Sequence, residues 1–357
     1  MIKYLGSKRV LLPQLTRIVR AIPRATSVLD LFSGTSRVGH ALKAHGYRVL
    51  ANDYASYAHA LATCYVQADA DEWLERAGRL IAELGEVAPR AGYFTRTFCE
   101  EARFFTPENG ARVDAIRDEI ARRALPWELE AIALVSLMEA ADRVDSTTGV
   151  QMAYLKRWAP RAANVLELRV PRLLPRPAAG GCTAHRMDAR EAARSLGADV
   201  AYVDPPYNQH SYLGNYHVWE TLVRWDAPEA YGVARKRLDV RTRPSDFNSR
   251  RRHADAMRAI VERVDATVLV VSFNDEGYLD RDELTEMLAA RGEVLVFEFD
   301  FRRYVGAQIG IHDHRGVKVG RVSHLRNREM IFVAGPAASL DALRDLEPDA
   351  LALATST

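Results

Sequence analysis

The feature that most constrains the fold is a strand, turn, helix and second strand near the start of the chain. Residues 27–32 (SVLDLF) form an apolar run that ends in a turn containing Gly34, and residues 37–45 have helical spacing. A second apolar run, residues 47–53 (YRVLAND), ends in Asp53. This order is the opening of a parallel sheet whose strands are connected by helices. The pattern therefore predicts an α/β fold.

Five further runs with strand character follow in the second half of the chain, at 182–187, 199–204, 266–273, 294–301 and 329–334. Between the two groups the spacing is helical, with apolar residues three and four apart in 55–66, 71–84, 107–123 and 127–144. Because so long a stretch without a strand is unusual in an α/β chain, we expect an inserted helical subdomain that the Pro/Gly-rich residues 171–181 close. The expected division is a catalytic domain with a mostly parallel seven-stranded sheet, residues 1–64 and 182–357, and a helical subdomain, residues 65–181.

The bulk properties are those of an ordinary globular protein. Of the 357 residues, 48% are hydrophobic and 27% are charged. We expect neither a membrane span nor export, since no run of 18 apolar residues occurs and the first residues contain no apolar signal core. Cys64, Cys99 and Cys182 form no CxxC pair, which argues against a zinc site or a disulfide framework and fits a reducing cytoplasm.

Basic residues are concentrated in three stretches, although the net charge is only +2. Residues 1–29 contain six Lys/Arg and no acid, residues 235–252 contain eight against two acids, and residues 302–328 contain seven against one. Such segregation suits a protein that turns one face toward a polyanion. The alternative for each stretch is a solvated surface loop. We treat residues 226–255 as a basic loop region.

The first strand and its turn predict a nucleoside-type cofactor. A glycine at position 34 lets the backbone pass close to a ligand, and the helix that follows offers free N–H groups. Asp53, 23 residues after Asp30, ends the second strand, where a carboxylate can accept hydrogen bonds from ribose hydroxyls. Only Gly39 follows, so the GxGxxG pattern of dinucleotide sites is missing. S-adenosylmethionine has no phosphate and needs fewer glycines; a purely structural turn is the alternative.

Residues 199–208 (DVAYVDPPYN) carry the strongest chemical signal. Asp204 ends a strand that should be buried on both faces, so it emerges at the edge of the sheet where α/β folds bind ligands. The two prolines that follow have no N–H donors, and Tyr207 comes next. This set of groups suits an aromatic amine. The carboxylate and the carbonyl can accept the two amine hydrogens, and the aromatic ring can stack on the face of the base. The alternative is a strand that merely ends in a turn.

DPPY after a DLFSG turn, with KYLGSK at the N-terminus, resembles the Dam-type (class α) N6-adenine-specific DNA methyltransferases over residues 1–60 and 182–335. Residues 139–158, 208–222 and 271–279 are similar to a subgroup of them. The resemblance implies a Rossmann-like methyltransferase fold that uses S-adenosylmethionine and acts on double-stranded DNA. One departure is Ser36, where many members have a second glycine; it leaves the geometry of the turn open.

The resemblance also implies roles for individual residues. Tyr4, Gly6 and Lys8 would border the methionine end of the cofactor, and the turn from Asp30 to Gly34 would hold its backbone. Asp53 would bind the ribose and Asp188 the adenine amine. The cofactor residues are thus Tyr4, Gly6, Lys8, Asp30, Phe32, Ser33, Gly34, Asp53 and Asp188, and the catalytic residues are Asp204, Pro205, Pro206 and Tyr207.

The implied reaction is a direct methyl transfer to adenine N6. If Asp204 and the Pro205 carbonyl accept both amine hydrogens, the nitrogen lone pair points outward for in-line attack. The target base must leave the duplex, and Tyr207 would stack on it. The chain has no Pro-Cys dipeptide, which disfavours the cytosine ring-carbon enzymes that use a cysteine nucleophile. A Ser in place of Asp204 is typical of N4-cytosine enzymes, so Asp204 favours adenine.

DNA contacts are expected from the basic stretches, with Arg235, Lys236, Arg237, Arg250, Arg251 and Lys318 as phosphate ligands, while the helical subdomain could read the sequence. Further polar candidates near the site or the insertion, each more often structural or solvated, are Gln151, Lys156, Arg157, Asn215 and His217. Residues 312–314 (HDH) offer no third ligand, so no metal is expected.

Restriction–modification or genome marking is the expected setting, with a cognate restriction endonuclease as a partner and a monomer or weak dimer in the cytoplasm. Three alternatives stay open. The acceptor could be cytosine N4 or an RNA adenine, the chain could be a catalytically silent DNA-binding protein, and a nicotinamide dehydrogenase is the weakest reading because the third glycine is missing.

Overall fold

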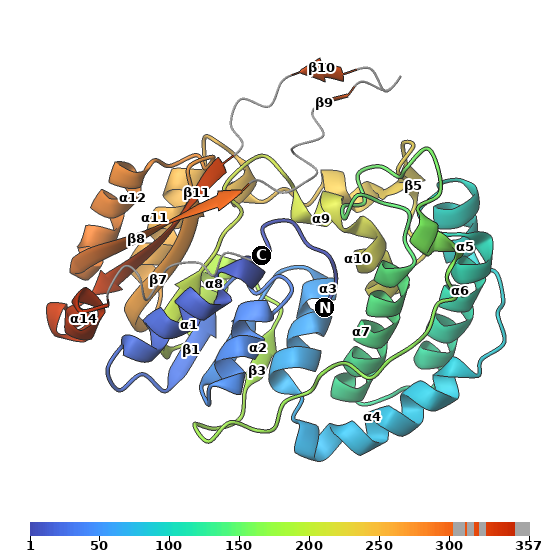
Figure 1. The fold of residues 1–357 in the computed structure, drawn as a ribbon, viewed down its shortest axis with the longest axis horizontal. Coiled ribbons are helices and arrows are strands. Elements are labelled where there is room, and N and C mark those ends of the chain that lie inside the picture. Colours follow the sequence, from blue (N-terminus) through green and yellow to red (C-terminus); the bar gives the residue numbers. More distant parts are fainter. Residues whose placement is uncertain (303–310, 313–317, 321–325, 347–357) are drawn as a thin grey trace.

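A computed structural model describes residues 1–302, 311–312, 318–320 and 326–346 (Figure 1). Its centre is a seven-stranded sheet with the strand order β3-β2-β1-β4-β7-β11-β8. The strands are β1 (Ser27–Asp30), β2 (Arg48–Asn52), β3 (Thr183–His185), β4 (Ala198–Val203), β7 (Ala266–Asn274), β8 (Glu293–Arg302) and β11 (Arg326–Gly335). Every run of the sequence that was predicted to be a strand is one of these seven, which confirms the predicted sheet.

The sheet is mostly parallel. β1 pairs in parallel with β2 and β4, β2 with β3, and β4 with β7, whereas β11 runs antiparallel between β7 and β8. The strand order reverses between β1 and β4, and such a switch point is where open α/β sheets bind ligands beyond the carboxyl ends of their strands. Both DLFSG and DPPY follow the strands that flank this point.

Helices cover both faces of the sheet (Figure 1). Successive side chains of a strand point to opposite faces, and Val28 and Leu29 of β1 accordingly belong to two different cores, both with no exposed surface. The first core is closed by α1 (Leu12–Ala21), α2 (Arg37–Ala44) and α14 (Ala337–Arg344). The second is closed by α8 (Ala189–Ser195), α11 (His253–Arg263) and α12 (Arg281–Leu288). Apolar residues on both faces explain why the strands read as continuous apolar runs.

A third core lies beside the sheet, where Figure 1 shows a group of helices next to α3. It is formed by α3 (Ser56–Ala62), α4 (Ala70–Gly85), α5 (Tyr93–Thr95), α6 (Pro107–Arg122), α7 (Trp127–Arg143) and α10 (His217–Arg224). The helices expected within 65–181 are therefore present, but they share their core with α3 and α10, which lie outside that range. Residues 171–181 form no helix, and their one bridge joins Leu174 to Asp69.

The remaining described elements are short. They are α9 (Tyr212–Asn215), the strand pair β5 (Ala230–Tyr231) and β6 (Lys236–Arg237), the pair β9 (Ile311–His312) and β10 (Lys318–Gly320), 3-10 turns at Lys8–Val10, Pro160–Ala163, Leu238–Arg241, Asp246–Asn248 and Ala289–Arg291, and π-turns at Thr63–Gln67 and Arg96–Glu100. Most of the basic stretch 302–328, and the C-terminal residues 351–357 that were expected to fray, lie outside the described residues. Among the helices described, none is long and apolar enough to span a membrane.

Candidate active site

A cavity of about 410 Å³ lies at the carboxyl ends of β1, β2, β3 and β4. Its walls come from the loops after these strands, from residues 4–8 of the N-terminal segment and from residues 243–248. This volume is in the range of pockets that bind small molecules and nucleosides. All nine residues that were predicted to bind the cofactor line this cavity, namely Tyr4, Gly6, Lys8, Asp30, Phe32, Ser33, Gly34, Asp53 and Asp188.

Two glycines allow the N-terminal segment to lie against the cavity. Gly34 has a φ of +50°, and a Cβ there would lie 3.3 Å from Cε1 of Tyr4. Gly6 has a φ of +68°, and a Cβ there would lie 3.0 Å from the Tyr212 hydroxyl. Both backbone angles favour glycine, and both positions leave little room for a side chain. Gly6 and Gly34 are therefore required both by the backbone conformation of their turns and by the close packing around them.

A column of tyrosines, which the sequence interpretation did not identify, holds this segment in place. The ring of Tyr4 stacks on Tyr216 at 4.5 Å and on Tyr212 at 5.2 Å between ring centroids. The Tyr216 hydroxyl accepts a hydrogen bond from the backbone N–H of Leu5 at 2.6 Å. The spacing of Tyr212 and Tyr216, four residues apart, was the available signal, since it places both rings on one side of a helical turn.

Two carboxylates face the cavity from the ends of β2 and β3. Asp53 accepts backbone hydrogen bonds from Gly34 at 2.9 Å and from Ala55 at 3.0 Å, so it fixes the glycine turn against β2. Burial raises the pKa of Asp53, and these amides oppose the shift. Asp188 caps α8 by accepting from the backbone N–H of Arg190 at 2.9 Å, and its side chain also pairs with the Arg190 guanidinium.

Several buried polar atoms of the cavity wall have no hydrogen-bond partner among the described residues. They are Oγ of Ser7, Oδ1 of Asp30, Oγ of Ser33 and Nε of Arg37. Leaving a buried polar atom unpaired is costly, so each of these atoms in a cavity-lining residue calls for a partner such as a bound ligand or water. Burial, together with the charge of Asp204, raises the pKa of Asp30 to about 8.

Asp204 follows β4 directly and lines the cavity. Its Oδ1 lies 3.1 Å from Nζ of Lys8, which also lies 3.2 Å from the Glu329 carboxylate. Burial raises the pKa of Asp204 to about 6, against the opposing effect of Lys8. Burial alone would lower the pKa of Lys8, but Asp204 and Glu329 outweigh it and hold that pKa well above its ordinary value. Lys8 is therefore a permanent cation whose side chain is only 5% exposed. Glu329 was not identified from the sequence.

The rest of the tetrapeptide lies beside the cavity. Pro206 lines it, whereas Pro205 and Tyr207 do not. The Tyr207 ring packs against Phe273 at 5.6 Å between centroids and lies 5.8 Å from Nζ of Lys8. Its backbone carbonyl accepts from the N–H of Tyr278 at 3.1 Å. The tetrapeptide is thus fixed both by the N-terminal segment and by the residues after β7.

Ser36 adopts the left-handed conformation that the missing glycine would favour. Its φ is +59° and its ψ is +22°, and the side chain is fully buried. The backbone N–H of Ser36 donates to the Ser33 carbonyl, and its own carbonyl accepts from His40 in α2. The turn therefore keeps its shape despite the serine, at the expense of backbone strain.

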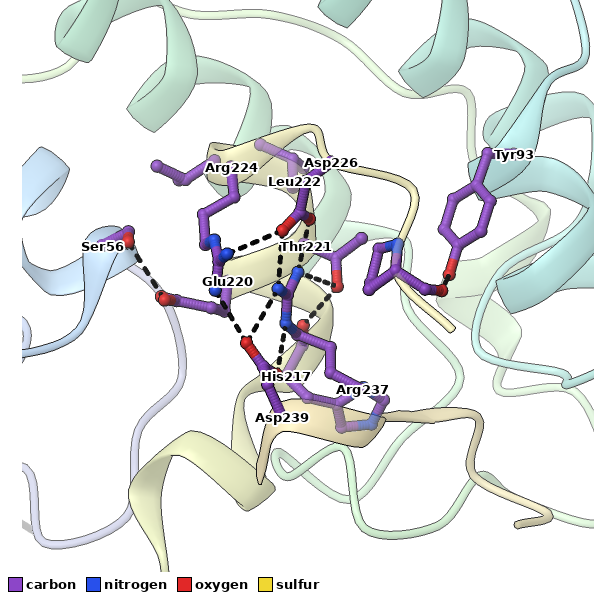
Figure 2. A network of polar contacts seen from close by, with 12 residues as sticks. Ser56, Tyr93, His217, Glu220, Thr221, Leu222, Arg224, Asp226, Arg237 and Asp239 are labelled. Carbon is purple, nitrogen blue, oxygen red and sulfur yellow. Dashed lines mark hydrogen bonds and ion pairs between the residues drawn. The ribbon is translucent and has the colours of Figure 1, made fainter. Parts of the chain in front are cut away.

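The residues expected to contact DNA lie in different environments, and Arg237 is buried. Its guanidinium forms ion pairs with Asp226 and Asp239 and donates to the Thr221 hydroxyl (Figure 2). With its side chain only 2% exposed, Arg237 stabilises the loop against α10 and does not face a phosphate backbone. This burial is at odds with the predicted DNA contact of Arg237.

The other basic candidates are more accessible. Arg235 pairs with Glu101 at 2.7 Å, and Nζ of Lys236 lies 2.9 Å from Sδ of Met152. Arg250 and Arg251 are exposed in the turn before α11. The side chain of Lys318 lies outside the described residues.

The polar candidates near the insertion divide into two groups. Gln151 and His217 are buried, with the Gln151 carbonyl 2.9 Å from Nε2 of His217, and Asn215 accepts a backbone bond from Gln151. These three residues are structural, whereas Lys156 and Arg157 are exposed. Within the described part of the chain, no group of acidic, histidine or cysteine side chains could hold a metal. His312 is described only as part of β9, and residues 313–314 lie outside the description.

Comparison with known proteins adds an independent finding. Residues 4–284 match the family model of the D12 class N6 adenine-specific DNA methyltransferases. The chain is 30% identical to the modification methylase StsI of Streptococcus sanguinis, over 85% of this chain and 48% of that protein. It is 27% identical to the type II methyltransferase M.NlaIII of Neisseria lactamica, over 83% of this chain and 89% of that protein.

A third relative is the type II methyltransferase M.FokI of Planomicrobium okeanokoites, which is 29% identical over 85% of this chain and 49% of that protein. The chain thus spans about half the length of StsI and M.FokI and most of the length of M.NlaIII.

Proposed function

Because the chain belongs to the D12 class of N6 adenine-specific DNA methyltransferases, we propose that it transfers a methyl group from S-adenosylmethionine to adenine N6 in double-stranded DNA. The observation that carries the proposal is the position of Asp204. Its carboxylate follows β4 at the switch point of the sheet and faces the same cavity as the nine proposed cofactor residues. The proposed binding site of the methyl donor and the carboxylate proposed to hold the target amine thus lie in one cavity.

The cavity suits S-adenosylmethionine in its chemistry. The cofactor carries hydroxyl and amine donors together with a carboxylate, and the unpaired atoms of Ser7, Asp30 and Ser33 can exchange hydrogen bonds with such groups. Asp53 would hold the ribose, Asp188 the adenine amine, and Tyr4, Gly6 and Lys8 the methionine end. When bound, the cofactor would supply a methyl group made electrophilic by its sulfonium.

The proposed work of the protein is to hold and polarise the target amine. Asp204 and the Pro205 carbonyl would accept the two N6 hydrogens, which directs the nitrogen lone pair outward. Lys8 would keep Asp204 oriented and favour its ionised form through the 3.1 Å contact. As the new bond to nitrogen forms, N6 loses one proton, for which Asp204 is the adjacent base. The amine is inaccessible inside a duplex, so the base would be flipped out and would stack on Tyr207.

Substitution of Asp204 tests this proposal. We expect Asp204→Ala to reduce methyl transfer by about 100- to 1000-fold, because removing a preorganised group that stabilises the transition state has effects of this size. Calorimetry should show that the variant still binds S-adenosylmethionine, since the other cofactor residues are intact. Normal turnover by Asp204→Ala would sink the proposed mechanism.

The finer aspects of the function are also part of the proposal. Residues 1–64 and 182–357 would form the catalytic domain, and the helices within 65–181 would contribute to target recognition. Arg250 and Arg251 are the exposed candidates for phosphate contacts. The names of the relatives favour a restriction–modification setting, in which a cognate endonuclease would cut the unmethylated sequence.

Mass spectrometry of nucleosides distinguishes the remaining alternatives. Incubation of the full chain with S-adenosylmethionine and either DNA or RNA should yield N6-methyladenine in the DNA. N4-methylcytosine, or methylation of the RNA alone, would favour the two enzymatic alternatives. A chain that binds DNA but binds no S-adenosylmethionine in calorimetry would be the catalytically silent alternative.

A further inference from the structure

A six-residue segment after the β5–β6 pair borders the cavity. All six of its residues, 243–248 (RPSDFN), line the cavity, and we call this segment the strap. The Phe247 ring meets Phe32 edge-on at 5.0 Å, which joins the strap to the loop after β1. Asp246 pairs with Arg190 at 2.9 Å, which joins it to the start of α8 after β3. The strap therefore contacts two of the three loops proposed to hold the cofactor.

The contact with the third loop, after β2, is made by Arg243. Its guanidinium lies 4.9 Å from the centroid of the Tyr54 ring, next to Asp53. The same guanidinium pairs with Glu220 at 3.2 Å and lies 3.8 Å from Asp239. Arg243 is thus fixed over the loop that carries the proposed ribose ligand.

The anchor of Arg243 is a fully buried carboxylate. Glu220 has no exposed side-chain surface and accepts hydrogen bonds from the Ser56 hydroxyl at 3.0 Å (Figure 2) and from the Tyr57 backbone N–H at 3.2 Å. These donors belong to the first turn of α3, where a negative charge is favourable. Since an unpaired buried charge would be costly, Glu220 strongly favours the position of Arg243 in which the two side chains pair.

The other end of the strap reaches the segment that follows the catalytic tetrapeptide. Nδ2 of Asn248 donates to the backbone carbonyls of Asn208 at 2.8 Å and His210 at 3.1 Å. The Tyr278 hydroxyl donates to the Asn248 carbonyl at 3.4 Å. Residues 208–210 belong to no helix or strand, and Gln209 and His210 are exposed. One side-chain amide therefore links the cofactor cavity to a turn that begins directly after Tyr207.

We propose that Asn248 is a positioning residue through which the strap couples cofactor binding to the alignment of residues 207–210. All six strap residues line the cavity, so a ligand bound there would restrict the motion of the strap. Through Asn248 this restriction is passed to the turn after Tyr207, so that binding of the methyl donor further restricts the acceptor side. The inference rests on the proposed function, because it assumes that S-adenosylmethionine occupies the cavity.

Two substitutions of Asn248 and one neighbouring control test the coupling. Asn248→Ala removes the amide, and Asn248→Asp keeps its shape but removes the donor. Ser249→Ala is the control, because Ser249 follows the strap directly and does not line the cavity. Each full-length variant is compared with the wild-type chain in S-adenosylmethionine affinity by calorimetry, in kcat and KM for methylation of genomic DNA, and in hydrogen exchange of residues 207–213 with and without S-adenosylmethionine.

We expect both Asn248 variants to bind S-adenosylmethionine within about threefold of the wild type while kcat falls about 10- to 100-fold, the size of effect that small misplacements of reacting groups produce. In the wild type and in Ser249→Ala, S-adenosylmethionine should slow exchange at residues 207–213. In the Asn248 variants it should bind without slowing that exchange. A purely structural role would instead lower thermal stability and leave the cofactor-dependent protection intact.

The coupling is overturned if either folded Asn248 variant keeps wild-type kcat, or keeps the protection that S-adenosylmethionine confers. Should Asn248→Ala unfold, the near-isosteric Asn248→Asp decides the question. Failure of the proposed function has a different signature, since the wild-type chain itself would then bind no S-adenosylmethionine or methylate no DNA.

Discussion

Asp204 is a carboxyl group on which burial and a neighbouring cation act in opposite directions. Burial raises its pKa to about 6, and the ammonium of Lys8 limits the rise. Protonation would turn one carboxyl oxygen into a donor and remove the negative charge that strengthens the proposed hydrogen bond from the amine. The chemistry proposed for Asp204 therefore depends on pH near neutrality.

A pH profile tests this dependence. With its pKa raised to about 6, Asp204 is mostly protonated at pH 5 and mostly ionised above pH 7. We therefore expect kcat/KM to be about tenfold lower at pH 5 than on the plateau above pH 7, with a single acidic limb near pH 6. Lys8→Met removes the cation that opposes the rise, so its limb should move to higher pH. Rates that stay constant from pH 5 to pH 8 in the wild type would contradict the assignment of Asp204.

Ser36 allows a stability prediction at the same scale. Its positive φ is strained for a serine, and its buried hydroxyl has no partner among the described residues. Ser36→Gly should therefore increase the free energy of unfolding in urea by about 0.5–1 kcal/mol, and the β-branched Ser36→Val should decrease it. A Ser36→Gly protein less stable than the wild type would show that the strain is compensated elsewhere.

Individual residues of the cavity wall were predictable from the sequence where a motif fixed them. Tyr4, Gly34 and Asp53 come from separate parts of the chain, yet all line the cavity, because the parallel sheet brings the ends of its strands together. Glu329 and Glu220 were not predictable in this way. Glu329 pairs with Lys8, 321 residues away, and Glu220 pairs with Arg243, 23 residues away, and no local pattern indicates such partners.

At the scale of elements, burial determined what the sequence could predict. The strands are buried on both faces, so runs such as 266–273 were identified with nearly correct ends. Short connecting helices such as α8 and α12 were not identified, whereas α2, which is equally short, was predicted because it follows a strand and a glycine turn. The long helices α4, α6 and α7 were predicted because they show several turns of apolar spacing.

The basic loop shows where a charge count misleads. Arg237 pairs with two aspartates and is buried, whereas Arg250 and Arg251 are exposed. We expect Arg237→Ala to lower the free energy of unfolding by about 2–3 kcal/mol, since it leaves two carboxylates without their cation. The double substitution Arg250→Ala and Arg251→Ala should change stability by less than about 1 kcal/mol in total.

DNA binding at several salt concentrations separates the two roles. Each phosphate contact contributes about 0.9 to the slope of log K against log salt, so the double variant should lose about 1.8 from that slope. Folded Arg237→Ala protein should keep the wild-type slope. The opposite pattern, with the slope reduced only by Arg237→Ala, would assign the DNA contact to the buried residue.

At the scale of the whole molecule, the helices within residues 65–181 share a hydrophobic core with helices of the sheet-forming part of the chain. Tyr57 and Leu61 of α3 and Leu222 of α10 contribute to the same core as the helices within 65–181. Removing residues 65–181 would expose this core. The predicted inserted subdomain was defined as one continuous range, but its helices pack against residues that precede the range and residues that follow it. Sequence spacing predicted the helices but could not show this shared packing, which depends on contacts between distant residues.

The family predicted from DLFSG and DPPY is confirmed by the match of residues 4–284 to the D12 class. The central claim that remains to be tested is that this chain methylates adenine N6 in DNA through Asp204. The most direct measurement is long-read mapping of modified bases in the genome of a methylation-free host that expresses either the wild-type chain or Asp204→Ala. We expect N6-methyladenine at one recurrent sequence with the wild type and none with Asp204→Ala. Modified cytosine, or equal adenine methylation by both chains, would contradict the account.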